Sequence, residues 1–122
     1  MPLRYVLDEH LRGPLFHAVQ AHNRLGVYPL DVTQVGDPAD LPLGTLDPLL
    51  LEWAERETRV LVTVDKNTIV GHLAAHLAAS RYSPGVFLIL PRSTIPELVE
   101  FLVDAGYASD FTDWENAAWY IP

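Results

Sequence analysis

The sequence predicts a three-layer α/β/α sandwich around a mostly parallel central sheet of four to five strands. Strand-like apolar runs alternate with helical patterns, and most of the connections between them are short. The run 59–64, Arg-Val-Leu-Val-Thr-Val, has almost no polar alternation, which is typical of a strand covered on both faces in a parallel sheet. With 122 residues, 49% of them hydrophobic, the chain predicts a single domain over residues 1–122.

Five short apolar segments predict the strands, and they are residues 3–7, 27–32, 59–64, 86–90 and 119–121. The second contains Pro29, which lacks a backbone donor and therefore places that strand at an edge of the sheet. The last segment is either a strand or a tail that packs on the sheet. Together with the helices between them, these strands predict the order β-α-β-α-β-α-β-α-β.

Apolar residues at helical spacing predict four helices, which cover residues 11–22, a segment opening at Asp47-Pro48, residues 67–79, and a segment from Thr94 to Gly106. Gly26 is expected to stop the first helix and Gly106 the last. Thr94 and Glu97 form a capping-box pattern. The residues expected to face the core are Leu11, Leu15, Ala18 and Val19, then Leu49, Leu50, Trp53 and Ala54, then Ile69, Val70, Leu73, Ala74 and Leu77, and finally Ile95, Leu98, Val99 and Leu102.

The composition limits the chemistry that the chain can carry. There is no cysteine, so disulfides, thiolate metal sites and a cysteine nucleophile are excluded. The 16 acidic residues against 8 basic ones give a formal charge of -8, which argues against a broad electrostatic grip on nucleic acid and fits a cation site or a basic partner. The sequence shows neither a leader pattern nor an apolar run of about 18 residues, so we expect a cytoplasmic protein with no membrane segment.

Carboxylates lie at three places where a predicted strand ends or a predicted helix begins. Asp8-Glu9 follows the first strand, Asp47 opens the second helix, and Asp65 follows the third strand. If the first and third strands are neighbours, these groups converge at one edge of the sheet, where α/β sheets bind ligands. Clustered carboxylates raise one another's pKa unless a cation lies between them. Oxygen ligands suit Mg²⁺ or Mn²⁺, which can activate water for phosphodiester hydrolysis.

Helix capping is the alternative interpretation of the same aspartates. Asp is among the best N-cap residues, and each of the three precedes a helical pattern. Asp47 followed by Pro48 has the residue types of a capped helix start. Capping alone, however, gives no reason for all three to meet at one sheet edge.

Three motifs resemble the small PIN-like domains that are predicted to be nuclease toxins of toxin-antitoxin modules. They are Leu7-Asp8-Glu9-His10, the helix start 47–54 of the form Asp-x-x-Leu-Leu-x-x-Ala, and the strand end 61–67, Leu-Val-Thr-Val-Asp-Lys-Asn. The match runs from about residue 3 to residue 90. The resemblance implies a Mg²⁺- or Mn²⁺-dependent ribonuclease with Asp8, Asp47 and Asp65 as metal ligands and Glu9 beside them. It also implies RNA as substrate and an antitoxin protein as partner.

The chain departs from that family at two positions. His10 stands where the family usually has Asn, and Asn67 stands where it has a second Asp. Asn67 keeps an oxygen ligand but removes one formal charge, so metal affinity should fall. Asp110 and Asp113 could supply a later acid, although turn residues are the simpler interpretation.

Histidines and basic residues near the motifs are candidates for contact with substrate. His10 could move a proton or touch phosphate, and Arg12 and Lys66 could bind the substrate backbone. His72 and His76 are one helical turn apart, so they either chelate a metal or lie on an exposed helix flank.

The aromatic residues Trp114, Trp119 and Tyr120 near the end of the chain either stack a base or bury a subunit contact. We favour the contact, and a homodimer is expected for so small a domain.

Two other functions remain open. A PIN-like protein with a degraded site would bind protein or RNA without cleaving it, as His10, Asn67 and the charge of -8 would allow. The acidic pair after strand one and Asp65 also resemble a phospho-accepting receiver domain. Such a domain needs a lysine after its fifth strand, whereas the only lysine here is Lys66.

Overall fold

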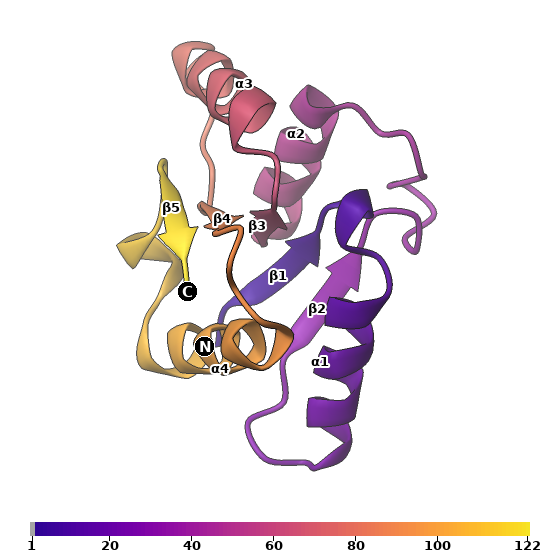
Figure 1. Cartoon of the computed structure of the whole chain (residues 1–122). Coiled ribbons are helices and arrows are strands. Elements are labelled where there is room, and N and C mark those ends of the chain that lie inside the picture. Colours follow the sequence, from indigo (N-terminus) through magenta and orange to yellow (C-terminus); the bar gives the residue numbers. More distant parts are fainter. Residues whose placement is uncertain (1) are drawn as a thin grey trace.

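Five parallel strands form the central sheet of the computed structural model, which describes residues 2–122 (Figure 1). They are β1 (Arg4–Leu7), β2 (Asp31–Gln34), β3 (Val60–Thr63), β4 (Val86–Ile89) and β5 (Ala118–Ile121). Their order across the sheet is β2-β1-β3-β4-β5, and every neighbouring pair is parallel. The predicted α/β class and the mostly parallel sheet are therefore confirmed.

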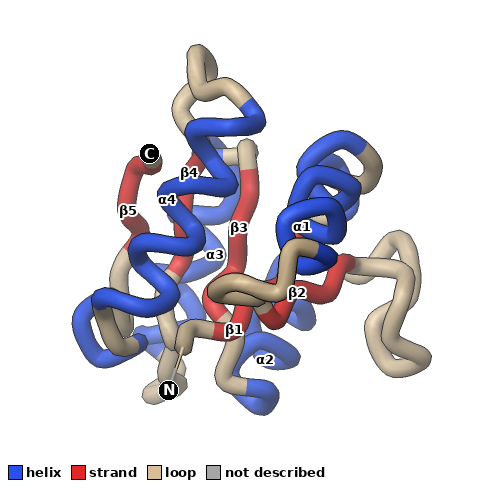
Figure 2. Tube along the Cα trace, turned by 90° about the horizontal axis from the view of Figure 1, so that it is seen from below, coloured by secondary structure: helices blue, strands red, loops and turns tan. Residues whose placement is uncertain are grey.

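Two helices cover each face of the sheet, which makes three layers (Figures 1 and 2). On one face lie α1 (Pro14–Arg24) and α4 (Ile95–Ala108), and on the other lie α2 (Asp47–Glu57) and α3 (Lys66–Ala78). Two short 3₁₀ helices, η1 (Glu9–Leu11) and η2 (Phe111–Asp113), complete the described elements. In the described part of the chain, no helix combines the length and the apolar character needed to cross a membrane.

The strand β3 is buried on both faces, as its composition predicts. Val60 and Val62 contact the core under α1 and α4, while Leu61 contacts the core under α2 and α3. Thr63 ends the strand and is only 1% exposed. Because alternate residues face opposite layers, the apolar run needs no polar alternation.

The order of the strands reverses between β1 and β3. From β1 the chain first adds β2 on one side and then crosses to add β3, β4 and β5 on the other side. The order 2-1-3-4-5 is that of flavodoxin-like doubly wound sheets, which bind ligands at the carboxyl ends of the strands where the order reverses. Asp8 follows β1 and Asp65 closely follows β3, so both lie at this point of the fold.

The second strand is an edge strand, as predicted, but it covers residues 31–34 and not 27–32. The segment before it turns, because Gly26 and Tyr28 have φ angles of 73° and 51°. The side chain of Asn23 holds the turn by donating to the Leu30 carbonyl at 2.8 Å and accepting from the Leu30 amide at 2.7 Å. Residues 33 and 34, which lie beyond the predicted end of this strand, consequently belong to β2.

Several predicted helix features are wrong. The first α-helix begins at Pro14 and not at residue 11, because η1 and Gly13 precede it. Leu49 and Val70 are 57% and 47% exposed. The buried positions of α2 and α3 include Leu51 and His76 instead.

Gly106 does not end the last helix. It is buried within α4, which continues to Ala108, and its carbonyl accepts a hydrogen bond from the Leu3 amide at 3.0 Å. The capping box of Thr94 and Glu97, by contrast, is present as predicted.

Replacing Gly106 by alanine should stabilise the protein by about 0.5–1 kcal/mol, because alanine favours the helix interior over glycine. A Cβ at Gly106 would meet its nearest neighbour, Leu30 Cδ2, at an ordinary 3.5 Å. Gly85→Ala is the matched control and should destabilise the protein, because Gly85 has φ +125° and its Cβ would lie 2.8 Å from the Trp114 carbonyl oxygen. Urea unfolding measures both, and a destabilising Gly106→Ala would contradict the helical placement.

Candidate functional site

An open hollow of about 420 Å³ lies at the carboxyl ends of β1 and β3 and collects the predicted aspartates. Its lining comes from three segments of the chain, and the residues are Asp8, Glu9, His10, Gly44, Thr45, Leu46, Asp47, Pro48, Asp65, Thr68 and His72. We call it the acidic hollow. The convergence of Asp8, Asp47 and Asp65 at one edge of the sheet, which the motifs predict, is thus present.

Asp8 is held by structural hydrogen bonds at the base of this site. It is 8% exposed. One carboxylate oxygen accepts from the Glu9 amide at 2.7 Å, and the other accepts from the Thr63 hydroxyl at 2.9 Å. The same hydroxyl accepts a hydrogen bond from the Asp65 amide at 3.1 Å. Thr63 therefore links the side chain of one aspartate to the backbone of the other.

Asp65 caps α3, as the alternative interpretation proposes. Its Oδ1 accepts from the amides of Asn67 and Thr68 at 3.1 and 3.2 Å, and its Oδ2 accepts from the Thr68 hydroxyl at 2.6 Å. The Thr68 side chain is the largest cause that lowers the pKa of Asp65, followed by the Thr68 amide, the Asn67 amide and the charge of His10. The expectation that clustering raises the pKa is wrong for this carboxyl, because hydrogen bonds to the ionised form dominate.

Asp47 has no capping role, contrary to the alternative interpretation. It is the first residue within α2, and the N-cap position is occupied by Leu46, whose side chain makes no cap. The Asp47 carboxylate lies 3.3 Å from the Thr68 hydroxyl. That hydroxyl has a single proton and lies closer to Asp65, so the donor is shared unequally. Asp47 and Asp65 therefore face each other across Thr68.

The loop before α2 is tied to the beginning of the chain at two points. Arg12 donates to the Val35 carbonyl at 2.7 Å and to the Asp37 carboxylate at 3.0 Å, which holds the start of the loop. Glu9 accepts from the Gly44 amide at 3.0 Å, which holds its end beside the acidic hollow. Glu9 is thus in the site, as predicted, whereas Arg12 is bound to the loop and does not line the hollow.

The remaining predicted residues divide between the hollow and the solvent. His10 lines the hollow and is exposed. Lys66 and Asn67 are exposed on the first turn of α3 and are not among the lining residues. Only the backbone amide of Asn67 takes part in the network, through its bond to Asp65.

The two histidines of α3 have separate environments. His76 is buried, and its Nε2 lies 3.0 Å from a Glu55 carboxylate oxygen and 2.8 Å from the Tyr82 carbonyl oxygen. Both predictions for His76 are therefore wrong, since it neither lies on an exposed helix flank nor forms a metal-chelating pair with His72. His72 is half-buried and lines the acidic hollow together with Asp65.

Thr63 and Thr68 are not among the predicted site residues, although the sequence carries a signal for each. Thr63 is the polar residue that ends the apolar strand, and Thr68 stands three residues after a capping aspartate, where side chains meet again on a helix. These two hydroxyls, rather than direct contacts, connect the three aspartates.

The carboxylate oxygens of the hollow suit a hard cation, but the predicted ligands Asp8, Asp47 and Asp65 are not placed to bind one ion together. Among residues 2–122, no three Asp, Glu or His side chains are placed to hold one ion together. Mg²⁺ keeps several waters and commonly takes one or two protein carboxylates. Asp47 and Asp65, which face each other across a hydroxyl, can provide two.

Removing the Asp65 carboxylate should destabilise the protein more at pH 7 than in acid. The folded-state pKa lies below the ordinary value of 3.8, so the stability contributed by the ionised group is present above that value and is lost as the pH falls through the folded-state pKa. Urea unfolding of wild type and Asp65→Ala at pH 7 and pH 2.5 measures this. Thr68→Val should reduce the same pH dependence, and an equal difference at both pH values would contradict the capping geometry.

No family model matches the chain, and comparisons with the curated proteins and with the solved structures find no match.

Proposed function

We propose that the protein is a Mg²⁺- or Mn²⁺-dependent ribonuclease that hydrolyses phosphodiester bonds at the acidic hollow. The observation that carries the proposal is the approach of Asp47 and Asp65 to the same Thr68 hydroxyl, at 3.3 and 2.6 Å, where the strand order reverses. Asp47 supports it most directly, because its carboxylate caps no helix. The resemblance to PIN-like domains supports the reaction class.

The residues of the hollow would divide the work among them. Asp47 and Asp65 would hold the ion, while Asp8, through Thr63, keeps the ends of β1 and β3 in place. A bound ion supplies an acidic water and stabilises charge on the phosphoryl group. His10 and His72 line the same hollow and would exchange protons with the water or with the leaving oxygen.

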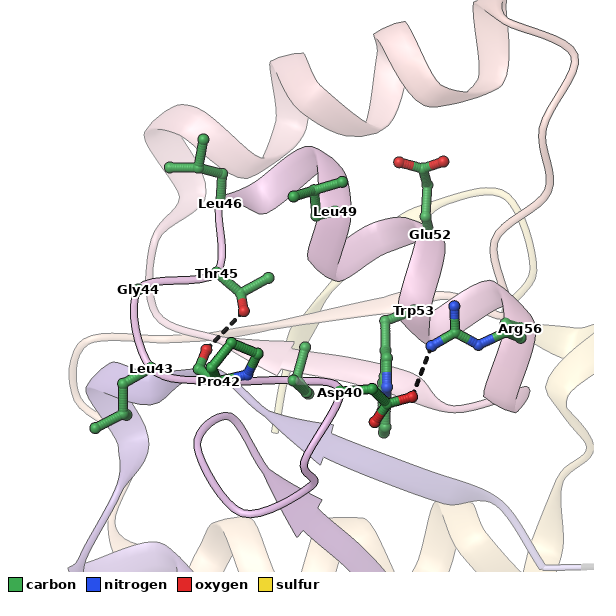
Figure 3. A pocket seen from close by; sticks show the side chains of 11 residues that line it. Asp40, Pro42, Leu43, Gly44, Thr45, Leu46, Leu49, Glu52, Trp53 and Arg56 are labelled. Atoms are coloured by element: carbon green, nitrogen blue, oxygen red, sulfur yellow. Dashed lines mark hydrogen bonds and ion pairs between the residues drawn. The ribbon is translucent and has the colours of Figure 1, made fainter.

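An apolar surface beside the hollow suits the protein partner that the resemblance implies. A second hollow of about 430 Å³ shares Gly44, Thr45 and Leu46 with the first (Figure 3). Leu43, Leu46 and Leu49 along it are 60%, 69% and 57% exposed. In a toxin-antitoxin pair, a cytoplasmic antitoxin would cover these leucines and the acidic hollow together.

A binding protein without nuclease activity is the second candidate. The observation in its favour is that Asp8 and Asp65 already accept structural hydrogen bonds, so both would be present without catalysis. The receiver interpretation has less support, because β5 contains no lysine and Lys66 follows β3 instead.

Mn²⁺ titrations by calorimetry distinguish the first two candidates. Wild type should bind Mn²⁺ at micromolar to low millimolar concentration, and Asp47→Asn should weaken binding at least tenfold, which corresponds to about 1.4 kcal/mol or more. Because the Asp47 side chain caps no helix, the unfolding free energy of the Asp47→Asn variant should stay close to that of wild type. Asp104→Asn on the exposed side of α4 is the matched control. Binding that Asp47→Asn leaves unchanged would remove the proposed ion site.

Cleavage of RNA tests the reaction itself. Wild type with Mn²⁺ should cut cellular RNA into discrete fragments visible on a denaturing gel, and Asp104→Asn should produce the same pattern. Asp47→Asn and a chelator should each abolish cleavage, because both remove the ion. RNA binding without cleavage, in a protein that binds no Mn²⁺, would favour the second candidate.

A further inference from the structure

The strand β5 forms an open edge of the sheet. It pairs with β4 on one side and stands last in the strand order. In Figure 1 it is the yellow arrow at the rim of the molecule, and in the turned view of Figure 2 it again lies at the rim. An open edge exposes backbone donors and acceptors, so natural proteins usually protect it.

The hydrogen bonds to β4 identify which backbone groups of β5 face outward. The carbonyls of Ala117 and Ile121 accept from the amides of Val86 and Leu90, at 3.0 and 2.8 Å. Because successive residues of a strand point their amide and carbonyl to opposite sides, Ala118 and Tyr120 direct theirs away from β4. These two residues supply two donors and two acceptors to the open edge.

The side chains of β5 do not protect this edge. Residues 116–122, Asn-Ala-Ala-Trp-Tyr-Ile-Pro, contain no charge in a chain of net charge -8. Trp119 and Tyr120 are 41% and 59% exposed. The opposite edge strand β2 begins instead with Asp31, which pairs with Arg4 and Arg59 at 3.2 and 2.8 Å. Of the two edges, only β5 offers an uncharged aromatic surface together with free backbone groups.

We propose that β5 pairs with β5 of a second copy across a two-fold axis, so that the two sheets form one. An antiparallel pair about this axis places Ala118 opposite the partner's Tyr120, with their backbone groups exchanging hydrogen bonds. Trp119 then lies beside the partner's Trp119 at the axis. A two-fold contact uses the same patch on both copies. The strand β5 satisfies that condition, because the residues with outward backbone groups, Ala118 and Tyr120, lie on either side of Trp119.

Charges at the two ends of β5 complement each other in this arrangement. Glu115 precedes the strand, and Arg92 lies near its end, because the neighbouring Ser93 hydroxyl donates to the Ile121 carbonyl at 3.3 Å. An antiparallel pair brings the beginning of one strand to the end of the other. The end of each strand that follows Glu115 therefore meets the end of the partner strand that lies near Arg92, while the uncharged strands meet between them. This favours a second copy of the chain over a partner with a charged edge.

Sedimentation equilibrium tests the association. Wild type, from low micromolar to submillimolar concentration, should show a monomer–dimer equilibrium, because a single strand pair is a small interface. Tyr120→Lys should be monomeric throughout, since lysine protects an edge strand. Tyr28→Lys is the matched control, because Tyr28 is an equally exposed tyrosine at 58% but lies away from β5, and it should dimerise as wild type does. A wild type that remains monomeric at every concentration would overturn the proposal.

Cysteine cross-linking tests the register, and the absence of cysteine from the chain makes single variants unambiguous. Trp119→Cys should form an intermolecular disulfide under mild oxidation, because residues at the axis of an antiparallel pair lie about 4.5–5.5 Å apart. Tyr120→Cys should link much more slowly, since its twin is displaced by two residues, about 6.8 Å along the strand. Val70→Cys, exposed on α3, measures random collisions.

Two results would contradict the register. One is that Trp119→Cys links no faster than Val70→Cys, and the other is that Tyr120→Cys links as fast as Trp119→Cys or faster. Should Trp119→Cys prove unfolded by circular dichroism, the double variant Ala118→Cys/Tyr120→Cys replaces it. In the proposed register its two cysteines face each other across the axis.

Discussion

The pairing of β1 with β3 is the constraint on which the rest of the structure depends. Its register sets Leu7 opposite Val62, and the Asp8 amide donates to the Val62 carbonyl at 3.0 Å. A shift by one residue would exchange the side chains of the two cores, because Val6 and Leu61 face one layer while Leu7 and Val62 face the other. Burial on both faces thus fixes the register. The same register places Thr63 beside Asp8, so the geometry of the acidic hollow follows from packing.

The sequence predicts what depends on local pattern and does not predict what depends on packing. The strand composition of β3, the edge position of β2 and the cap at Asp65 are local properties, and the structure contains each of them. Gly106 resembled a helix stop because glycine is common there, yet it is buried within α4 beside Tyr5 and Leu30. The partners of His76 come from α2 and from the segment after α3. No spacing within α3 can indicate them.

Capping and clustering prove to be compatible roles, although at the sequence level they looked like alternatives. A helix that follows a parallel strand starts at the carboxyl edge of the sheet, so a capping aspartate is placed where ligands bind. Asp65 illustrates this, since it caps α3 and also lines the hollow. Asp47 differs, because Leu46 already has the extended backbone of an N-cap, with φ -71° and ψ 150°. The Asp47 carboxylate therefore has no structural role as a cap that would explain its place in the hollow.

The distribution of cations decides how a polyanion could approach this surface. Arg4, Arg12, Arg56, Arg59 and Arg81 are each paired with carboxylates of the fold. Near the hollow, His10 is the residue whose charge acts on Asp65. The carboxylates of the hollow would repel phosphate unless a divalent ion lay between them. If the proposed function holds, RNA binding at this site would require an ion for affinity as well as for chemistry, and substrate binding and catalysis would depend on the same two aspartates.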